Sequence, residues 1–178
     1  MKKTLNIALG ILFCFLLIGC QKDSDGSDPV VNSTNHFKVG NVEYPLSQGK
    51  LTLWNNGYDR CSISLFSSTI TMGGDGYLNG PGYYMELDCI NSNSSELDEG
   101  KYVIDLTGTN KMHTIYNMAY NLVKIGGADD QYFVNITKGE VDFKSIGNGI
   151  YEVKIDCATN TGVQVTGYYK GALHKFYR

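Results

Sequence analysis

Few residue patterns in this 178-residue chain have the spacing that catalysis or metal binding requires. The three histidines form no H-x-H or H-E-x-x-H pattern, so they do not predict a zinc site. The acid pairs Asp98-Glu99 and Asp129-Asp130 are adjacent in sequence, and adjacent residues on a strand point to opposite faces. The glycine-rich segment 73–82 lacks the Lys-Ser/Thr of a phosphate loop and is expected to be a mobile connection. We therefore expect a protein that is not an enzyme and carries no metal or cofactor.

Aromatic side chains are the stronger candidates, because thirteen tyrosines and one tryptophan are many for this length. Exposed aromatic rings supply rigid binding area at low conformational cost. The alternative is that outward rings only cover a second layer of β-structure, since sheet surfaces favour aromatic residues in any case. The rings expected to lie outward or in loops, and taken as candidate ligand-binding residues, are Trp54, Tyr58, Tyr77, Tyr84 and Tyr168. The tyrosines expected to lie inward are Tyr44, Tyr83, Tyr151 and Tyr169.

Three cysteines fall in the part of the chain that is expected to fold: Cys61, Cys89 and Cys157. Each alternates with apolar neighbours on one face of a predicted strand, as a small buried hydrophobic residue would. We therefore expect buried thiols rather than a nucleophile. A Cys61–Cys89 disulfide is the alternative, and with three thiols at least one stays unpaired within the chain.

A fourth cysteine lies at the end of an apolar segment. Residues 1–3 are Met-Lys-Lys, and residues 5–18 are mostly apolar but too short and interrupted for a spanning helix, which is typical of a secretory signal. The segment Leu17-Ile18-Gly19-Cys20 resembles the lipobox of bacterial lipoproteins, in which aliphatic and small residues precede an invariant cysteine. The resemblance implies cleavage before Cys20 and acyl chains such as palmitate on that residue, which together anchor a protein stably. The alternative is a plain signal peptide with a coincidental cysteine.

The residues after Cys20 suggest where the anchor lies. In lipoproteins of this type an aspartate directly after the cysteine favours the inner membrane, and here the residue is Gln21. The acidic segment that follows resembles the tether of surface-displayed lipoproteins in some Gram-negative groups. The resemblance implies an outer-membrane anchor, with the chain on the cell surface or, alternatively, on the periplasmic face. The segment also has the form D-x-D-G-x-D, but the twelfth position of a calcium loop would fall on Thr34, so a solvated tether is the better interpretation.

Composition and charge limit the classes of partner. Loss of residues 1–19 removes Lys2 and Lys3 and leaves 13 basic and 18 acidic side chains, a net charge of −5. No basic stripe is present, so the chain is not expected to bind nucleic acid. Residues 20–35 are polar and are expected to form a flexible tether with a span of roughly 20–25 Å. Residues 36–178 are long enough for one domain with its own core.

Short alternating segments predict an all-β domain. With Gly40-Asn41 as a two-residue turn, Phe37 faces Tyr44. With residues 147–149 as a loop, Phe143 faces Val153 and Lys144 faces Glu152, and both faces of the hairpin are then satisfied.

A third hairpin is expected with Lys138-Gly139 as its turn, which pairs Ile136 with Val141 and makes residues 132–157 a three-stranded meander. Residues 113–125 fit both a strand and a helix; we expect a strand, because no helix cap is evident and the flanking segments are strands.

We therefore expect about ten short antiparallel strands in a β-sandwich or flattened barrel, with a lipocalin-like barrel as the alternative. The segments FKVGNVEYPL, KGEVDF, YEVKIDC and VTGYYKGAL resemble a group of small β-rich lipoproteins of gut-type Gram-negative bacteria. That resemblance implies a structure and a location but no activity.

The function expected is a membrane-anchored, non-enzymatic binding or accessory module for a glycan or a protein. The first alternative is a carrier that holds a small apolar ligand inside a barrel. A hydrolase is the second alternative, and it would need a cleft where two acids or a histidine-paired nucleophile converge.

Overall fold

The computed structural model describes residues 34–54, 59–92, 95–107, 111–121 and 133–178. The chain divides into two units, residues 1–31 and 32–178, and every described residue belongs to the second. The signal segment 1–19, Cys20 and almost all of the predicted tether therefore lie outside the described residues, and so does Tyr58.

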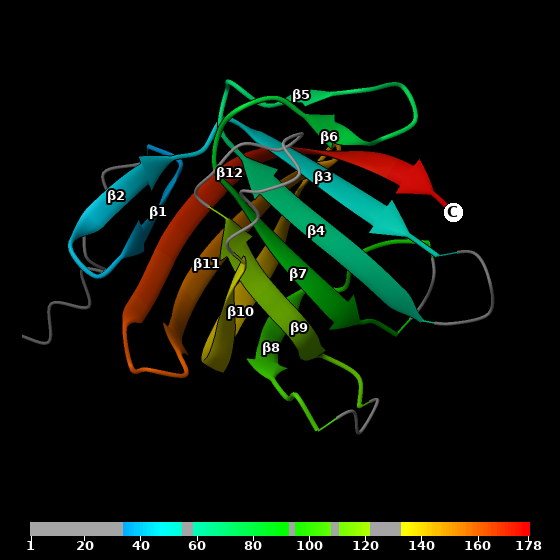
Figure 1. Ribbon diagram of the computed structural model, residues 1–178. Coiled ribbons are helices and arrows are strands. Elements are labelled where there is room, and N and C mark those ends of the chain that lie inside the picture. Colours follow the sequence, from blue (N-terminus) through cyan, green and yellow to red (C-terminus); the bar gives the residue numbers. More distant parts are fainter. Residues whose placement is uncertain (1–33, 55–58, 93–94, 108–110, 122–132) are drawn as a thin grey trace, which may run out of the picture. The chain divides into compact units, whose positions relative to one another are not determined.

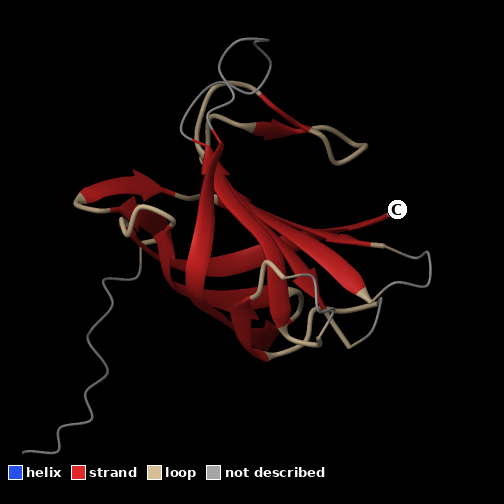
Figure 2. Ribbon diagram, turned by 60° about the horizontal axis from the view of Figure 1, so that its bottom comes forward, coloured by secondary structure: helices blue, strands red, loops and turns tan. Residues whose placement is uncertain are grey.

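The described residues form β-strands and no helix, as Figure 2 shows, so the all-β prediction is confirmed. The strands are β1 (His36–Val39), β2 (Val42–Pro45), β3 (Gln48–Leu53), β4 (Arg60–Phe66), β5 (Thr71–Met72), β6 (Leu78–Asn79), β7 (Tyr84–Ile90), β8 (Gly100–Ile104), β9 (Thr114–Asn121), β10 (Phe133–Gly147), β11 (Ile150–Thr159) and β12 (Gln164–Tyr177).

Ten of these strands form one sheet, in the order β11-β10-β8-β9-β7-β4-β3-β12-β1-β2. A further pairing between β11 and β12 closes the first eight strands of that order into a barrel. The β1–β2 hairpin extends from β12, and β5 and β6 form a separate two-stranded hairpin (Figure 1). The sandwich prediction is therefore wrong, and the barrel alternative holds. Sequence alternation could not separate the two, because both architectures bury one face of each strand.

Two features depart from the expected set of short antiparallel strands. The β3–β12 and β8–β9 pairs are parallel. The strands β10 and β12 have 15 and 14 residues, respectively, because each passes from one neighbour to the next. The first part of β12 pairs with β1 and β11, and its last part pairs with β3. These long strands are what close the sheet.

The two clearest hairpin predictions are confirmed. Phe37 faces Tyr44 across β1–β2. Phe143 faces Val153 across β10–β11. Residues 114–121 form the strand β9, as expected, whereas residues 122–125 of that prediction lie outside the described residues.

The predicted turn at Lys138-Gly139 is wrong, because β10 continues through it with a bulge. Gly139 has a φ of +118°, and a Cβ at this position would lie 2.3 Å from the Asp156 carbonyl oxygen and 2.5 Å from the Cys157 Cα. The glycine therefore allows the close approach of β11 rather than a chain reversal. The two halves of the strand then pair with β9 and β8.

The barrel interior is filled by the chain's own side chains. One apolar cluster joins residues from most of the barrel strands, and its largest fully buried members include Tyr102, Tyr169 and Phe143. The carrier alternative would require an internal cavity of several hundred Å³ and stays a prediction. The inward tyrosine prediction is confirmed, since Tyr151 and Tyr169 are buried and Tyr44 and Tyr83 pack against the cluster.

The three cysteines of the domain are buried and free, as expected. Cys61 and Cys89 lie directly opposite each other on β4 and β7, yet they are not bonded. Burial raises the pKa of the Cys157 thiol to about 12, with a smaller contribution from Asp156. A thiol of this kind is protonated at neutral pH and is a poor nucleophile.

Candidate functional site

The outer face of β3, β4 and β7 carries polar side chains that the barrel interior excludes. Alternation along the strands turns Leu51, Ile63 and Leu87 inward, so the residues between them point outward. Cross-strand register then aligns Lys50, Ser64 and Glu86 side by side, which we call the charged row. Two residues further along, Thr52, Ser62 and Asp88 form a second polar row.

The β5–β6 hairpin lies over one end of this outer face. Its apolar contact is the cluster of Phe66, Ile70 and Tyr84, against which Met72 and Leu78 pack. The hairpin thus has its own small core on the outside of the barrel. The glycine-rich segment 73–82, expected to be a mobile connection, is instead an ordered part of this structure.

Gly76 fixes the tip of the hairpin against the barrel. It has a φ of +79°, and a Cβ there would lie 2.8 Å from the Phe176 ring, so only glycine fits without strain. The Lys50 ammonium donates a hydrogen bond to the Gly76 carbonyl oxygen at 3.2 Å. The Tyr77 ring stacks under the Arg178 guanidinium, with 4.9 Å between the guanidinium carbon and the ring centroid.

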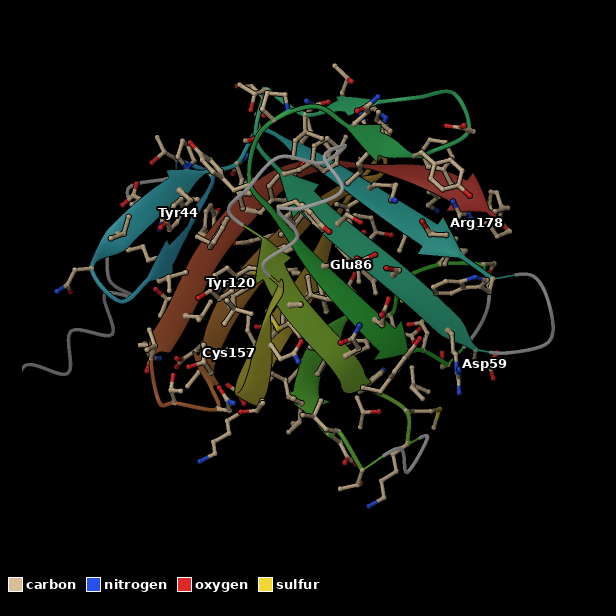
Figure 3. The ribbon with its side chains drawn as sticks, viewed as in Figure 1. Tyr44, Asp59, Glu86, Tyr120, Cys157 and Arg178 are labelled. Atoms are coloured by element: carbon tan, nitrogen blue, oxygen red, sulfur yellow. The ribbon has the colours of Figure 1, made fainter. Side chains whose placement is uncertain are left out.

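A cleft of about 240 Å³ lies between the hairpin and the charged row. The side chains that line it are Lys50, Ser64, Tyr77, Leu78, Tyr84, Glu86 and Arg178. They come from the strands β3, β4, β6 and β7, from the loop between β5 and β6, and from the residue that follows β12. Figure 3 shows two of them, Glu86 on β7 and Arg178 at the end of β12.

Burial perturbs both charged members of the charged row. It raises the pKa of the Glu86 carboxyl, and the neighbouring Asp88 raises it further. It lowers the pKa of the Lys50 ammonium, an effect that Glu86 partly opposes. Both groups therefore lose solvation without full compensation, which is common at functional sites.

No ion pair with another described residue neutralises these charges. Glu86 accepts a hydrogen bond from the Ser62 hydroxyl at 3.2 Å, and Lys50 donates only to a backbone carbonyl. Neither they nor Arg178 belong to any salt bridge within the described residues. Hydrogen-bonding capacity is thus left over, directed at the cleft.

The second polar row continues toward β9. The Asn117 amide donates to the Asp88 carboxylate at 2.8 Å. Beyond it, the Arg60 guanidinium lies over the Tyr116 ring at 5.1 Å. Trp54 follows β3, and its backbone N–H donates to the Arg60 carbonyl at 3.4 Å. The charged row and the second polar row together form a polar strip, and aromatic rings flank this strip at both ends.

The structure brings only some of the candidate aromatic residues together. Tyr77 is 64% exposed and lines the cleft. Tyr84 also lines it and points outward, but the hairpin covers it to 9% exposure. Tyr168 is 8% exposed and lies apart from the cleft, on the segment of β12 that pairs with β1 and β11. The expectation that Tyr84 and Tyr168 are exposed is wrong, because neighbouring elements cover them. Trp54 is half-buried at the far end of the strip.

Lys50, Glu86 and Arg178 were missed by the sequence analysis. Acids were considered only as adjacent pairs, which point to opposite faces. Glu86 and Asp88 are two residues apart and share a face, about 7 Å apart along the strand. The two-residue spacing of these acids was the feature of the sequence that could have identified Glu86. The position of Arg178 depends on the parallel β3–β12 pairing and had no local signal.

A larger cleft, of about 520 Å³, lies near the β10 bulge and is less promising. Two acids there, Glu140 and Asp156, face each other across β10 and β11. Lys101 neutralises the first at 2.6 Å, and Gln164 donates to the second at 2.6 Å. Cys157 at this cleft is the unreactive buried thiol described above.

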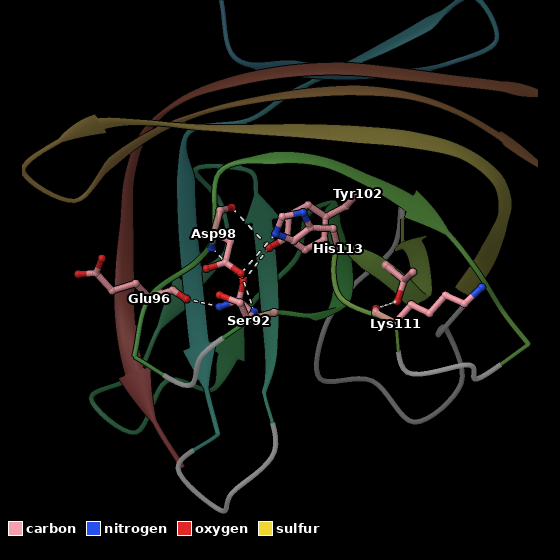
Figure 4. A network of polar contacts seen from close by, with 8 residues as sticks. Ser92, Glu96, Asp98, Tyr102, Lys111 and His113 are labelled. Carbon is pink, nitrogen blue, oxygen red and sulfur yellow. Dashed lines mark hydrogen bonds and ion pairs between the residues drawn. The ribbon is translucent and has the colours of Figure 1, made fainter.

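A second group of polar residues, with Asn91 and Tyr102 buried at its centre, lies where β7 ends and β9 begins, and we call it the end network (Figure 4). The Tyr102 hydroxyl and the Asp98 backbone N–H both donate to the Asn91 side-chain oxygen, at 2.7 and 2.9 Å. The His113 imidazole lies 3.4 Å from the Asp98 carboxylate, which also accepts from the Ser92 backbone N–H at 2.5 Å. These contacts join residues 91–92 and 98 to Tyr102 and His113 of the barrel.

The described residues contain no group of three or more histidine, cysteine or acidic side chains that could hold a metal ion.

Nor does any helix in the described ranges have the length and apolar character needed to cross a membrane.

Comparison of the chain with protein-family models, with curated proteins and with solved structures found no match.

Proposed function

We propose that this protein is a lipid-anchored, non-enzymatic binding module of the bacterial outer membrane, and that the cleft under the β5–β6 hairpin binds a surface glycan. The observation that carries the binding function is the charged row. Two half-buried charges without ion-pair partners face an open cleft that also presents an exposed tyrosine. Burying a charged group costs free energy unless an opposite charge or hydrogen bonds compensate it. Two charged side chains without ion-pair partners in a cleft therefore favour a ligand that supplies those partners.

The mixture of groups favours a carbohydrate as the ligand. Sugar hydroxyls both donate and accept hydrogen bonds, and the cleft offers a donor at Lys50 and an acceptor at Glu86. The apolar face of a sugar ring stacks on an aromatic ring, and Tyr77 is an exposed ring at the cleft.

Hydrolysis is a second candidate, supported by one observation. Glu86 and Asp88 share the outer face of β7, and burial raises the pKa of Glu86, as in the general acid of a glycosidase. Both acids, however, already accept hydrogen bonds from neighbouring side chains, and only Glu86 lines the cleft. Incubating the protein with any glycan that binds, and analysing the products, separates binding from turnover.

A glycan array with the purified protein tests the binding function. Changing Tyr77 to Ala should remove most of the signal, and changing Trp54 to Ala should weaken it. The control is Tyr177→Ala. Tyr177 is 62% exposed at the end of β12, next to Arg178, but its side chain does not line the cleft. Absence of any glycan or protein ligand, or equal loss in the Tyr177 variant, would contradict the proposal.

The anchor is tested independently. The Leu17–Cys20 segment supports lipidation at Cys20, so mass spectrometry of the exported protein should find an N-terminus at Cys20 that carries acyl chains. Cys20→Ala should move the protein from the detergent phase to the aqueous phase. Retention of the variant in the membrane fraction would contradict the anchor while leaving the cleft untouched.

A further inference from the structure

The charges around the cleft are unequal. Lys50 from β3 and Arg178 after β12 contribute two cations to its lining, and Glu86 from β7 is the one acid among the described residues that line it. Asp88 lies one row further along and accepts from Asn117, and Asp75 in the hairpin accepts from the Tyr77 backbone N–H at 3.1 Å. His174 is an exposed residue on β12, opposite Lys50. The lining therefore has one positive charge in excess.

Both cations have donors left for a ligand. An ammonium group has three N–H donors, and Lys50 uses one of them on the Gly76 carbonyl. The Arg178 guanidinium carbon lies 4.9 Å from the centroid of the Tyr77 ring, and its N–H groups donate to no other described residue. On the opposite side of the cleft, Glu86 accepts only from Ser62 and has acceptor capacity to spare.

The spacing of these groups sets the size of the ligand. Lys50 and Glu86 are separated by one intervening strand, so their Cα atoms are about 10 Å apart. A molecule that meets both needs an anionic acceptor at one side and a hydroxyl donor at the other.

We propose that the cleft selects acidic sugars, with the carboxylate held by Lys50 and Arg178, a ring hydroxyl donating to Glu86, and the ring against Tyr77. This inference rests on the proposed glycan-binding function and names its ligand class. A single carboxylate balances the one excess charge of the lining, whereas a doubly charged phosphate would leave a negative charge over. A neutral sugar would leave the excess positive charge of the lining without a counter-charge.

The test uses the full chain in detergent and two matched pairs of probes. The first pair is trigalacturonate and its methyl ester, and the second is sialyllactose and lactose, so uronic and sialic acids are compared separately. Titration calorimetry should show that at least one acid binds about tenfold or more tightly than its uncharged counterpart. Added salt should weaken the binding of the acidic sugar and leave the binding of the uncharged probe unchanged.

Variants locate the effect. Lys50→Gln keeps a donor for the Gly76 carbonyl but removes the charge, and it should abolish the preference for the acid. Lys101→Gln is the control, because Lys101 is an exposed lysine on β8 that already pairs with Glu140. Circular dichroism of each variant checks that it is folded.

The outcomes separate the two proposals. Equal binding of an acid and its uncharged counterpart, or a preference that survives Lys50→Gln, overturns the choice of acidic sugars and leaves glycan binding standing. Binding of a phosphorylated sugar in preference to the carboxylates also overturns it. Failure of every glycan to bind the folded protein overturns both.

Discussion

The cleft and the end network both contain buried polar side chains, but they satisfy them in opposite ways. In the end network, the Asn91 oxygen accepts from both the Tyr102 hydroxyl and the Asp98 backbone N–H, and Asp98 accepts in turn from its own neighbours. In the cleft, Lys50 and Glu86 are desolvated and face open space without an ion pair among the described residues. In the end network the polar groups form hydrogen bonds that stabilise the fold, whereas in the cleft they remain able to bond to a ligand.

This difference shows how a structural polar group is distinguished from a functional one. Both regions contain acids, and the end network even pairs a histidine with an aspartate, which is the pattern first sought in a hydrolase. Residue types therefore do not decide the matter. What decides it is whether the hydrogen-bonding capacity is used within the protein, since a used group contributes stability and an unused one requires an external partner.

The largest expected effect lies in the end network. Asn91→Ala removes the acceptor of the Asp98 N–H and the shorter of the two acceptors of the Tyr102 hydroxyl, which keeps only the Asp98 carbonyl at 3.4 Å. We expect the free energy of unfolding to fall by about 3 kcal/mol. Urea unfolding followed by the fluorescence of Trp54, the only tryptophan, measures it.

The matched control is Asn160→Ala, because Asn160 is an exposed residue between β11 and β12. Its effect should stay within about 0.5 kcal/mol. A loss below 1 kcal/mol for Asn91→Ala would show that the end network does not stabilise the fold, and the contrast with the cleft would then fail.

In the cleft, the hairpin is the more sensitive element. Gly76→Ala introduces a methyl group 2.8 Å from the Phe176 ring at a positive φ, so the tip of the hairpin must move. Because the rest of the barrel is unaffected, we expect a loss of only about 1–2 kcal/mol in stability. Ligand binding should fall by at least about tenfold, since Tyr77 moves with the tip.

Gly74→Ala tests whether that loss is specific. Gly74 lies in the same loop, and a Cβ there would have no atom within 4 Å. Its binding and stability should match those of the unchanged protein. Equal losses in the two variants would mean that the loop is sensitive to any substitution and that the contact with Phe176 is unimportant.

A smaller effect follows from the raised pKa of Glu86. Because the folded protein holds the Glu86 proton more tightly than the unfolded chain does, stability from this group is greatest at low pH. It falls as the pH rises from about 4.5, the ordinary value for glutamate, through the raised pKa. Glu86→Gln should remove this decline, which is measured as the difference in unfolding free energy between the two proteins from pH 4 to 8.

Glu43→Gln gives the opposite sign and serves as the control. The hydrogen bond from Lys38 lowers the pKa of the exposed Glu43 carboxyl. Its small contribution is therefore present above the ordinary pKa and lost as the pH falls. A Glu86 variant with the same pH profile as the unchanged protein would contradict the desolvation of the charged row.

The sequence predicted local pairing far better than closure. The hairpins at residues 36–45 and 141–155 were correct because opposite side chains on both faces agree at a single register. The turn at Lys138-Gly139 was wrong because a glycine with positive φ serves a bulge as well as a turn, and only the contact with Cys157 decides between them. Closure depends on the β11–β12 and β3–β12 pairings, and the second joins residues over 100 positions apart.

The candidate site was predicted only in part, for the same reason. Tyr77 and Tyr84 were identified from composition and alternation, and they do line one cleft. Their partners come from β3, β7 and the end of β12, which only the assembled barrel brings together. Tyr168 shows the limit of alternation, since it reports which face a side chain takes but not which element covers that face.

The smallest effect provides the finest comparison, between a paired and an unpaired lysine. The Lys101 ammonium is exposed and lies 2.6 Å from the Glu140 carboxylate, so Lys101→Gln should lower the unfolding free energy slightly. Lys50 is half-buried without an ion-pair partner, so Lys50→Gln removes a desolvated charge and should leave stability unchanged or raise it by about 0.5 kcal/mol. Urea unfolding of both variants at low salt measures the sign of each change in unfolding free energy. A loss of stability in the Lys50 variant would show that its charge already serves the fold, and the cleft would then resemble the end network rather than contrast with it.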